Sequence, residues 1–261
     1  MGNLKVGVMI ESFRLGVKGG IRKAAELKAD GFQIYATGGE VAPWNLSKTG
    51  RRDFMTFVKG QGLVVSALCG DFGGHGFADS QGLDERVAKT KQVLDLSRDL
   101  GVSVVTTHVG TVPEDLKSPV AAMMADAVNE IGAYAEKVGA SLASETGPES
   151  GKHMAEFLRM LKSGAVKVNY DPANLVMMGF DHLQGVRDLA PYIVHTHAKD
   201  GVRGADGKHA EVPLGKGGVQ WHEYLAALEE VGYRGFFTIE REVGGNPVAD
   251  IQEAIRFLRQ F

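Results

Sequence analysis

Four residues of the kinds that bind metal ions or transfer protons recur at intervals in the second half of the chain. They are Glu145, Asp171, His197 and Glu240, and successive members lie 26, 26 and 43 residues apart. Each follows a short apolar run, and each interval fits one strand and one helix, the last lengthened by a loop. Three carboxylates and one imidazole suit a divalent cation, whereas without a cation the three carboxylates would repel one another. We therefore predict a metal site formed by Glu145, Asp171, His197 and Glu240.

A simpler interpretation is that these residues are polar only because a strand meets solvent at its end. The residues before them favour the metal site. Side chains alternate along a strand, so Lys167 and Asn169 share a face with Asp171, and His195 shares one with His197. Polar side chains one layer below a metal typically orient its ligands.

The sequence around these residues alternates regularly between two patterns, short apolar runs and longer amphipathic stretches. Short β-branched runs predict strands near 5–11, 31–36, 63–70, 103–109, 141–146, 166–171, 193–198 and 235–241. Amphipathic stretches predict helices near 18–30, 47–60, 83–100, 117–138, 151–163, 181–190, 220–231 and 247–260. Glycines that follow these stretches are expected to end the helices, at Gly31, Gly62, Gly101, Gly139, Gly164 and Gly232.

Eight strand–helix pairs in a chain of 261 residues match the size of a (β/α)8 TIM barrel. We predict this α/β fold as a single domain over residues 1–261, with chemistry at the carboxyl ends of the strands. The alternative is an open doubly wound sheet, which normally has a glycine fingerprint after its first strand. The glycines at 16–20 have the wrong spacing for that fingerprint.

Other residues near predicted strand ends are candidates for binding the substrate. His108 follows the fourth strand, where a structural histidine is an equally good interpretation. Residues 200–218 form a long glycine-rich connection, and structureless loops of that length are usually functional. Within it, Arg203 is the best candidate for holding a hydroxyl, carboxylate or phosphate. The backbone amides of residues 213–218 are a weaker candidate for a phosphate cradle.

Composition excludes several classes of protein. The formal net charge of −3 argues against a surface built for nucleic acid or anionic lipid. A single cysteine, Cys69, cannot form an intrachain disulfide, which suits a reducing compartment. We see no membrane span and no signal peptide at the first residues, so we expect a cytoplasmic protein with no membrane partner.

Several motifs resemble those of the xylose-isomerase-like TIM barrel superfamily of sugar phosphate isomerases and epimerases. They are Ser-Glu at 144–145, Asn-Tyr-Asp-Pro-Ala-Asn-Leu at 169–175, His-Thr-His-Ala-Lys-Asp at 195–200, Val-Pro-Leu-Gly-Lys-Gly-Gly at 212–218 and Thr-Ile-Glu-Arg-Glu at 238–242. The resemblance covers nearly the whole chain. It implies one divalent metal on Glu145, Asp171, His197 and Glu240, with Mn²⁺ expected first and Co²⁺, Mg²⁺ or Zn²⁺ as alternatives. It also implies a homo-oligomer, either a dimer or a tetramer.

The same resemblance suggests further roles. In the ketose 3-epimerases of this family the two glutamates, here Glu145 and Glu240, are the proton-transfer pair. An arginine six residues after the metal histidine contacts the substrate, and that position is Arg203. The chain departs from those epimerases at Asn174, where they have a substrate-binding histidine, and at Glu149, which lies four rather than six residues after Glu145. We keep Asn174 as a candidate substrate contact.

We therefore expect a metal-dependent isomerase or epimerase that acts on a sugar, sugar phosphate or polyol ketone. A divalent cation would stabilise the enediolate formed when Glu145 or Glu240 removes a proton beside a carbonyl. The main alternative is a lyase or dehydratase of inositol-like or modified sugars, because elimination starts with the same step. A non-catalytic sugar-binding barrel and a nuclease for abasic DNA are further alternatives. The absence of a basic surplus and the presence of Asn174 argue against the nuclease, so we expect a carbohydrate and no nucleic acid as partner.

Overall fold

Eight parallel strands close into a barrel in the computed structural model, which describes residues 4–74 and 76–261. Residues 1–3, which contribute to the expectation of no signal peptide, lie outside the described part. The barrel strands are β1 (Lys5–Met9), β2 (Gly31–Tyr35), β3 (Val64–Cys69), β4 (Val104–Thr107), β5 (Ser141–Glu145), β6 (Val166–Tyr170), β7 (Ile193–Ala198) and β10 (Phe236–Ile239). Their order around the barrel is β1-β10-β7-β6-β5-β4-β3-β2, which confirms the predicted (β/α)8 fold.

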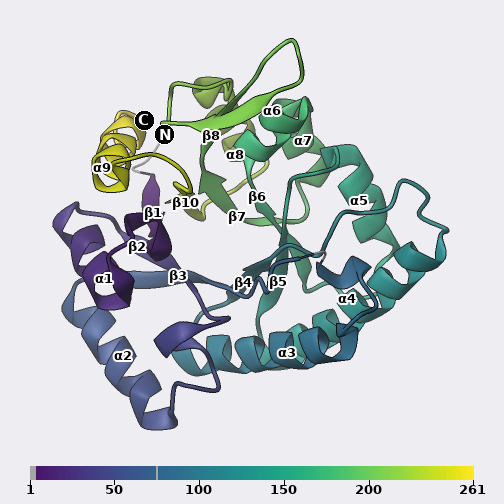
Figure 1. The fold of residues 1–261 in the computed structure, drawn as a ribbon, viewed down its shortest axis with the longest axis horizontal. Helices are drawn as coiled ribbons and strands as arrows, with labels where there is room; N and C mark the ends of the chain where they lie inside the picture. Colours follow the sequence, from purple (N-terminus) through teal and green to yellow (C-terminus); the bar gives the residue numbers. More distant parts are fainter. Residues whose placement is uncertain (1–3, 75) are drawn as a thin grey trace.

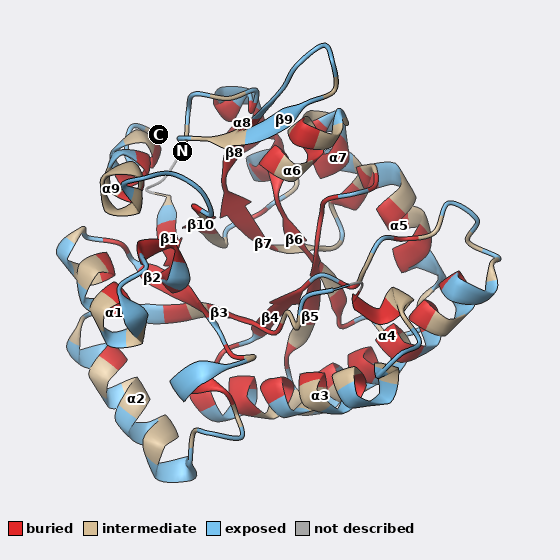
Figure 2. Cartoon of the chain, in the orientation of Figure 1, coloured by how far each residue is buried: buried red, intermediate tan, exposed pale blue. Residues whose placement is uncertain are grey.

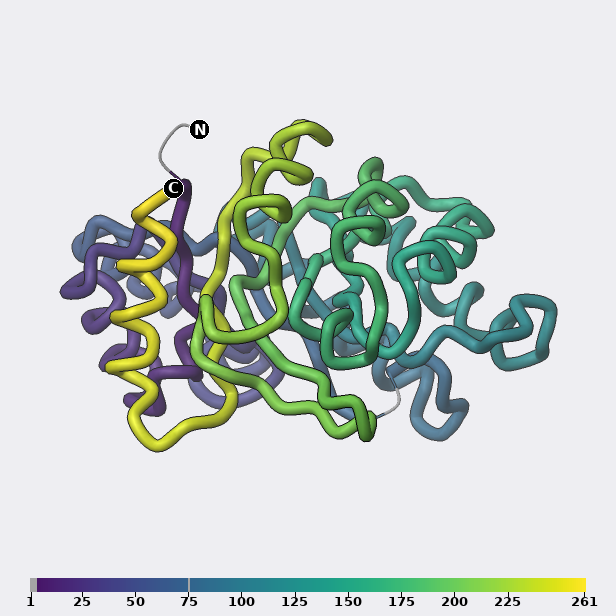
Figure 3. The backbone as a smooth tube through the Cα atoms, turned by 90° about the horizontal axis from the view of Figure 1, so that it is seen from above, coloured from purple at the N-terminus to yellow at the C-terminus, as the bar shows by residue number. Residues whose placement is uncertain are grey.

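Helices surround the barrel and cover the outer face of the strands (Figure 1). They are α1 (Gly16–Glu26), α2 (Lys48–Gly60), α3 (Leu83–Leu100), α4 (Pro119–Val138), α5 (Gly151–Met160), α6 (Pro172–Met178), α7 (His182–Leu189), α8 (Trp221–Glu230) and α9 (Pro247–Leu258). Figure 2 shows the buried residues along the strands and on the helix faces that turn toward them. Figure 3 shows α9 beside the N-terminal part of the chain, where β10 pairs with β1 and closes the barrel.

The glycines after the helices serve two different purposes. Gly101 has a φ of +71° and its amide donates to Arg98, so it ends α3 as predicted, and Gly62, Gly139 and Gly232 are also left-handed. Gly31 and Gly164 are not in the left-handed region among the described residues. Gly31 instead begins β2, where a Cβ atom would come within 2.8 Å of the Val64 carbonyl oxygen. The predictions of a helix end at Gly31 and at Gly164 were therefore wrong. Close strand packing requires Gly31, and α5 already ends at Met160.

Three local elements differ from the predicted pattern. The first strand ends at Met9 rather than at residue 11, because Ile10–Phe13 turns into a 3-10 helix. The short helix α6 follows β6 directly and was not predicted. Residues 200–218 are not a structureless loop, because β8 (Asp200–Arg203) and β9 (His209–Val212) form an antiparallel hairpin.

The buried carboxylate of Asp200 holds the segment after this hairpin in place. It accepts hydrogen bonds from the amides of Gly201, Gly215 and Val219 at 2.9, 2.9 and 3.1 Å, and from the indole nitrogen of Trp221 at 3.1 Å. The amides of residues 213–218, a weaker candidate for a phosphate cradle, are directed to partners within the protein. The amide of Gly215 donates to Asp200, and those of Lys216 and Gly218 donate to the carbonyls of Pro213 and Gly201, so the prediction of a phosphate cradle there was wrong.

None of the helices that the structure describes is both long and apolar enough to span a membrane.

The hydrogen bonds of Asp200 predict its contribution to stability. Asp200→Ala leaves buried donors without an acceptor, so we expect the free energy of unfolding to fall by about 3 kcal/mol. Urea denaturation followed by circular dichroism measures this change. Asp206→Ala, at the exposed tip of the same hairpin, is the matched control and should change stability by less than about 0.5 kcal/mol. Equal losses in the two variants would contradict the role given to Asp200.

Candidate metal centre

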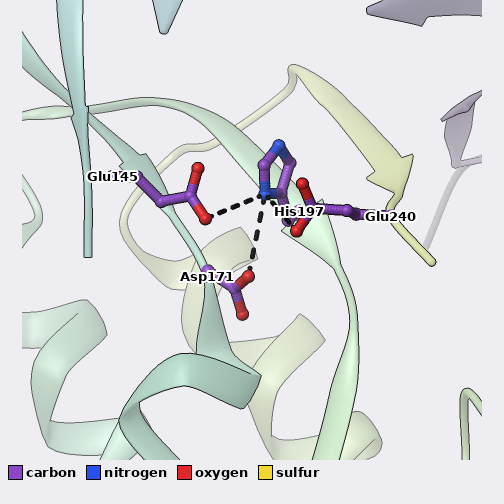
Figure 4. Close-up of side chains that lie close together, drawn as sticks. All are labelled: Glu145, Asp171, His197 and Glu240. Carbon is purple, nitrogen blue, oxygen red and sulfur yellow. Dashed lines mark ion pairs between the residues drawn. The ribbon is translucent and has the colours of Figure 1, made fainter. Parts of the chain in front are cut away.

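The barrel brings the four predicted metal ligands together at the carboxyl ends of neighbouring strands. Glu145 ends β5, Asp171 follows β6, His197 lies in β7, and Glu240 follows β10. Figure 4 shows the three carboxylates arranged around one ring nitrogen of His197. From His197 Nδ1 the nearest carboxylate oxygens are 3.4 Å away on Glu145, 3.7 Å on Asp171 and 3.4 Å on Glu240. One ligand atom from each residue lies within 4.8 Å of the others.

Two buried atoms of this cluster are left without a partner. Asp171 and His197 are fully buried, and neither Asp171 Oδ2 nor His197 Nδ1 has a hydrogen-bond partner among residues 4–74 and 76–261. The other oxygen of Asp171 caps α6 by accepting from the amides of Ala173 and Asn174 at 2.8 and 3.0 Å. Buried polar atoms normally find a partner, so two unpartnered ligand atoms beside two more carboxylates fit a divalent cation. These residues could hold such an ion.

A layer of polar side chains lies directly below the four ligands. Gln33 Oε1 is 3.0 Å from His197 Nε2, and the amide nitrogen of Asn169 donates to Glu145 at 3.1 Å. Asn169 and His195 point into the barrel, as strand alternation predicts. Lys167 is half-buried and its ammonium lies 3.5 Å from the carbonyl of Pro191. Gln33 was not predicted, because it is a single polar residue in an apolar run.

Lys199 is a residue of the site that the sequence analysis missed. Its ammonium is almost completely buried, donates to Glu240 at 2.8 Å and to Glu242, and lies 3.8 Å from Asp171 Oδ2. The alternation that places His195 and His197 inward extends to residue 199, and this signal could have found it. Lys199 supplies a permanent positive charge beside the carboxylates.

Mutual attraction between these charges shifts their pKa values. Burial alone would lower the pKa of His197 and of Lys199, but the neighbouring carboxylates, Glu240 and Glu145 among them, raise both well above their ordinary values. Burial alone would raise the pKa of Glu240, but His197 and Lys199 outweigh it and hold that pKa below its usual range. Glu240 is therefore ionised at neutral pH.

His108 lies at the wall of the site, as predicted. Its Nδ1 is hydrogen-bonded to Asp71, which follows β3, and its Nε2 is 3.7 Å from Glu145 Oε1. The charge of Glu145 raises the pKa of His108 to about 9, against the opposing effect of burial and with the help of Asp71. At neutral pH His108 is a cation that Asp71 holds in a fixed orientation.

The structure treats the other two candidate substrate contacts differently. The amide nitrogen of Asn174 donates to Glu145 Oε1 and to the carbonyl of Thr146 at 3.1 and 3.0 Å, so Asn174 belongs to the site. Arg203 is exposed, and its guanidinium donates to the carbonyl of Met177 at 2.7 Å. It does not line the pocket in this structure, and its contact with a substrate stays a prediction.

A pocket of about 140 Å³ opens directly above the cluster. Its lining combines uncharged side chains with charged ones. Its lining residues are Met9, Tyr35, Cys69, Asp71, Thr106, Thr107, His108, Glu145, Asn174, Lys199, Glu240 and Glu242. A space of this size and polarity suits a small polar molecule.

Glu149 lies outside this pocket, which agrees with its unusual spacing from Glu145. It is buried, its Oε2 accepts from the amide of Val112 at 3.3 Å, and its Oε1 has no partner among the described residues. Burial raises the pKa of Glu149 to about 7, although Val112 and the nearby His153 and His108 act in the opposite direction.

Comparison with known proteins identifies the family of the chain. A model of the xylose isomerase-like TIM barrel family matches residues 21–261, so the chain belongs to this family. An uncharacterized protein of Methanocaldococcus jannaschii is 24% identical over 177 residues. That match covers 61% of this chain and 59% of the relative, so it spans less than two thirds of the relative's length.

Solved structures support the same assignment. A xylose isomerase domain protein of Planctomyces limnophilus has a TM-score of 0.87 and 27% identity, covering 99% of this chain and 96% of that one. A protein described as the probable 3-DHS dehydratase of petrobactin synthesis in Bacillus anthracis has a TM-score of 0.79 at 17% identity, covering 98% of each chain. A D-psicose 3-epimerase of Clostridium cellulolyticum has a TM-score of 0.78 at 17% identity, covering 98% of this chain and 99% of that one. The last two likenesses show the fold alone.

The raised pKa of Glu149 predicts how stability depends on pH. Between pH 4.5 and about 7 the native carboxyl retains a proton that the unfolded chain has lost, so stability falls as pH rises through this range. Glu149→Gln removes this loss and keeps an acceptor for Val112. We expect the variant to be more stable than the wild type by about 2 kcal/mol at pH 8, and equally stable at pH 4.5.

Urea denaturation at both pH values, with a chelator present to exclude metal binding, measures this difference. An effect of the same size at both pH values would show that the substitution acts through packing and would contradict the assignment.

Proposed function

We propose that this chain is a divalent-metal-dependent isomerase or epimerase of a sugar, sugar phosphate or polyol ketone. The observation that carries the proposal is the placement of Glu145 and Glu240. Each puts a carboxylate oxygen 3.4 Å from His197 Nδ1, and the two come from strands β5 and β10, which lie on different sides of β7 in the barrel. Two carboxylates that face one point from different sides can serve the two faces of a planar intermediate.

The chemistry requires both a cation and a base. A proton beside a carbonyl is too weakly acidic to leave unaided, and a bound divalent cation would polarise that carbonyl and stabilise the resulting enediolate. We assign Glu145, Asp171, His197 and Glu240 as its ligands and Mn²⁺ as the first ion to test. Asp171 and His197 act only as ligands, whereas Glu145 and Glu240 also transfer protons.

Proton transfer depends on the groups around the two glutamates. His197 and Lys199 hold Glu240 ionised, so this carboxylate is ready to accept the proton of the substrate. On the other side, Glu145 Oε1 accepts a hydrogen bond from the side-chain amide of Asn174 and lies 3.7 Å from His108 Nε2. His108 can pass a proton to Glu145, which returns it to the opposite face of the intermediate. His108 and Asn174 are also placed to bind hydroxyl groups of the substrate.

The second candidate function is a metal-dependent lyase or dehydratase on the same site. It is favoured by the His108–Asp71 pair, because a cationic imidazole at the pocket wall can protonate a hydroxyl group as it leaves. The initial removal of a proton is common to both reactions. The mass of the product separates them, since isomerisation conserves mass and dehydration lowers it.

The role of Glu240 leads to a direct test of the proposal. Removing a positioned general base typically lowers the rate about 10²- to 10⁴-fold, so we expect Glu240→Gln to lower kcat at least 100-fold. The assay incubates ketoses, ketose phosphates and inosose-like compounds with the Mn²⁺-loaded protein in D₂O and follows deuterium incorporation by NMR. Chelation with EDTA should abolish turnover by the wild type, and added Mn²⁺ should restore it.

Glu253→Gln is the matched control, because Glu253 is exposed on the outer face of α9. It should keep wild-type turnover. Wild-type protein that binds no divalent metal, together with full turnover by Glu240→Gln, would overturn the proposal.

A further inference from the structure

The polar layer below the metal ligands has a role that proton transfer does not explain. Its members are at most 1% exposed and come from five different strands: Gln33, Thr106, Asn169, His195 and Thr238. Barrel interiors are usually filled by apolar side chains, and burying a polar group costs free energy unless it is hydrogen-bonded. The donors and acceptors of this layer can therefore be assigned from their partners.

The orientation of Gln33 follows from its contact with Thr106. The amide nitrogen of Gln33 donates to Thr106 Oγ1 at 2.8 Å, so its carbonyl oxygen faces His197 Nε2 at 3.0 Å. An amide oxygen can only accept, so this contact is a hydrogen bond only when Nε2 is protonated. Nδ1 is then the ring nitrogen that faces the three carboxylates, and it is the atom that can bind a cation once its own proton has left.

Asn169 instead places a hydrogen-bond donor beside the same ring nitrogen, Nε2 of His197. Its amide nitrogen donates to Glu145 at 3.1 Å and also lies 3.2 Å from His197 Nε2. Its carbonyl oxygen is 2.8 Å from His195 Nδ1, and His195 Nε2 is 2.9 Å from the hydroxyl of Thr238, so the amide of Asn169 cannot easily reverse. If Nε2 accepted from Asn169, the proton of a neutral His197 would be on Nδ1 and would block the ligand position.

We propose that Gln33 is the positioning residue that accepts the Nε2 proton of His197 and holds Nδ1 toward the carboxylates, and thereby sets the affinity of the site for a divalent cation. This inference rests on the proposed metal centre. The metal-bound state needs an acceptor for the proton on Nε2, and Gln33 is the residue that provides it. Without that acceptor, Nε2 faces the amide nitrogen of Asn169, which is a second donor. The metal-free ring can turn away from this contact, whereas a ring held by the metal cannot, so affinity falls.

The experiment measures Mn²⁺ affinity by competition with a chelating dye, on folded protein and without any substrate. Gln33→Met keeps the length of the side chain and removes the acceptor, and we expect affinity to fall about 10- to 100-fold. Gln33→Glu keeps an acceptor and should stay within about fivefold of the wild type or bind more tightly. Ser66→Ala is the control, since Ser66 lies in β3 and its hydroxyl has no partner among the described residues.

A second variant keeps the test decisive if Gln33→Met does not fold. Thr106→Val removes the acceptor that orients the amide of Gln33, so the amide can reverse, and we expect affinity to fall by about 3- to 10-fold. Wild-type affinity in a folded Gln33→Met or in Thr106→Val would overturn the inference and leave the metal centre intact. A wild-type chain that does not bind Mn²⁺, Co²⁺, Mg²⁺ or Zn²⁺ would overturn both.

Discussion

The convergence of three carboxylates on one buried point is the constraint on which the rest of the site depends. Glu145, Asp171 and Glu240 are held by strand ends rather than by flexible loops, so they cannot move apart to relieve their repulsion. A buried lysine, Lys199, and His197, which lies between the carboxylates, offset this repulsion. A divalent cation would complete this balance, because Asp171 Oδ2 and His197 Nδ1 have no hydrogen-bond partner in the part of the chain that the structure describes.

The barrel supplies this convergence through its topology. Because parallel strands all end at the same rim, residues 26 and 43 positions apart in sequence become neighbours in space. Local structure then refines the geometry. One oxygen of Asp171 caps α6, which fixes the rotation of the carboxylate and leaves the other oxygen directed at His197. The same side chain thus begins a helix and completes the site.

The sequence predicted those features that depend on local patterns. The eight strand–helix units follow from periodicity, and the four central residues follow from their regular position after apolar runs. Contacts between distant segments could not be read in the same way. Gly31 is required by packing against Val64, and the hairpin of β8 and β9 is organised by Asp200 through amides up to 19 residues away. Arg203 was predicted from its place in the long connection and from the resemblance, and the fold directs its guanidinium to the carbonyl of Met177.

The interior of the barrel shows how stability and function compete for the same positions. Apolar side chains at the positions of Gln33, Asn169 and His195 would suit a barrel core, since each polar group there needs partners that only a few rotamers allow. These partners nevertheless exist, in chains that run from Thr106 to His197 and from Thr238 to Glu145. Both chains end on a proposed metal ligand. Because the hydrogen bonds of this polar layer lead to proposed metal ligands, they fix the proton positions at the site. An apolar core of equal volume could not do this.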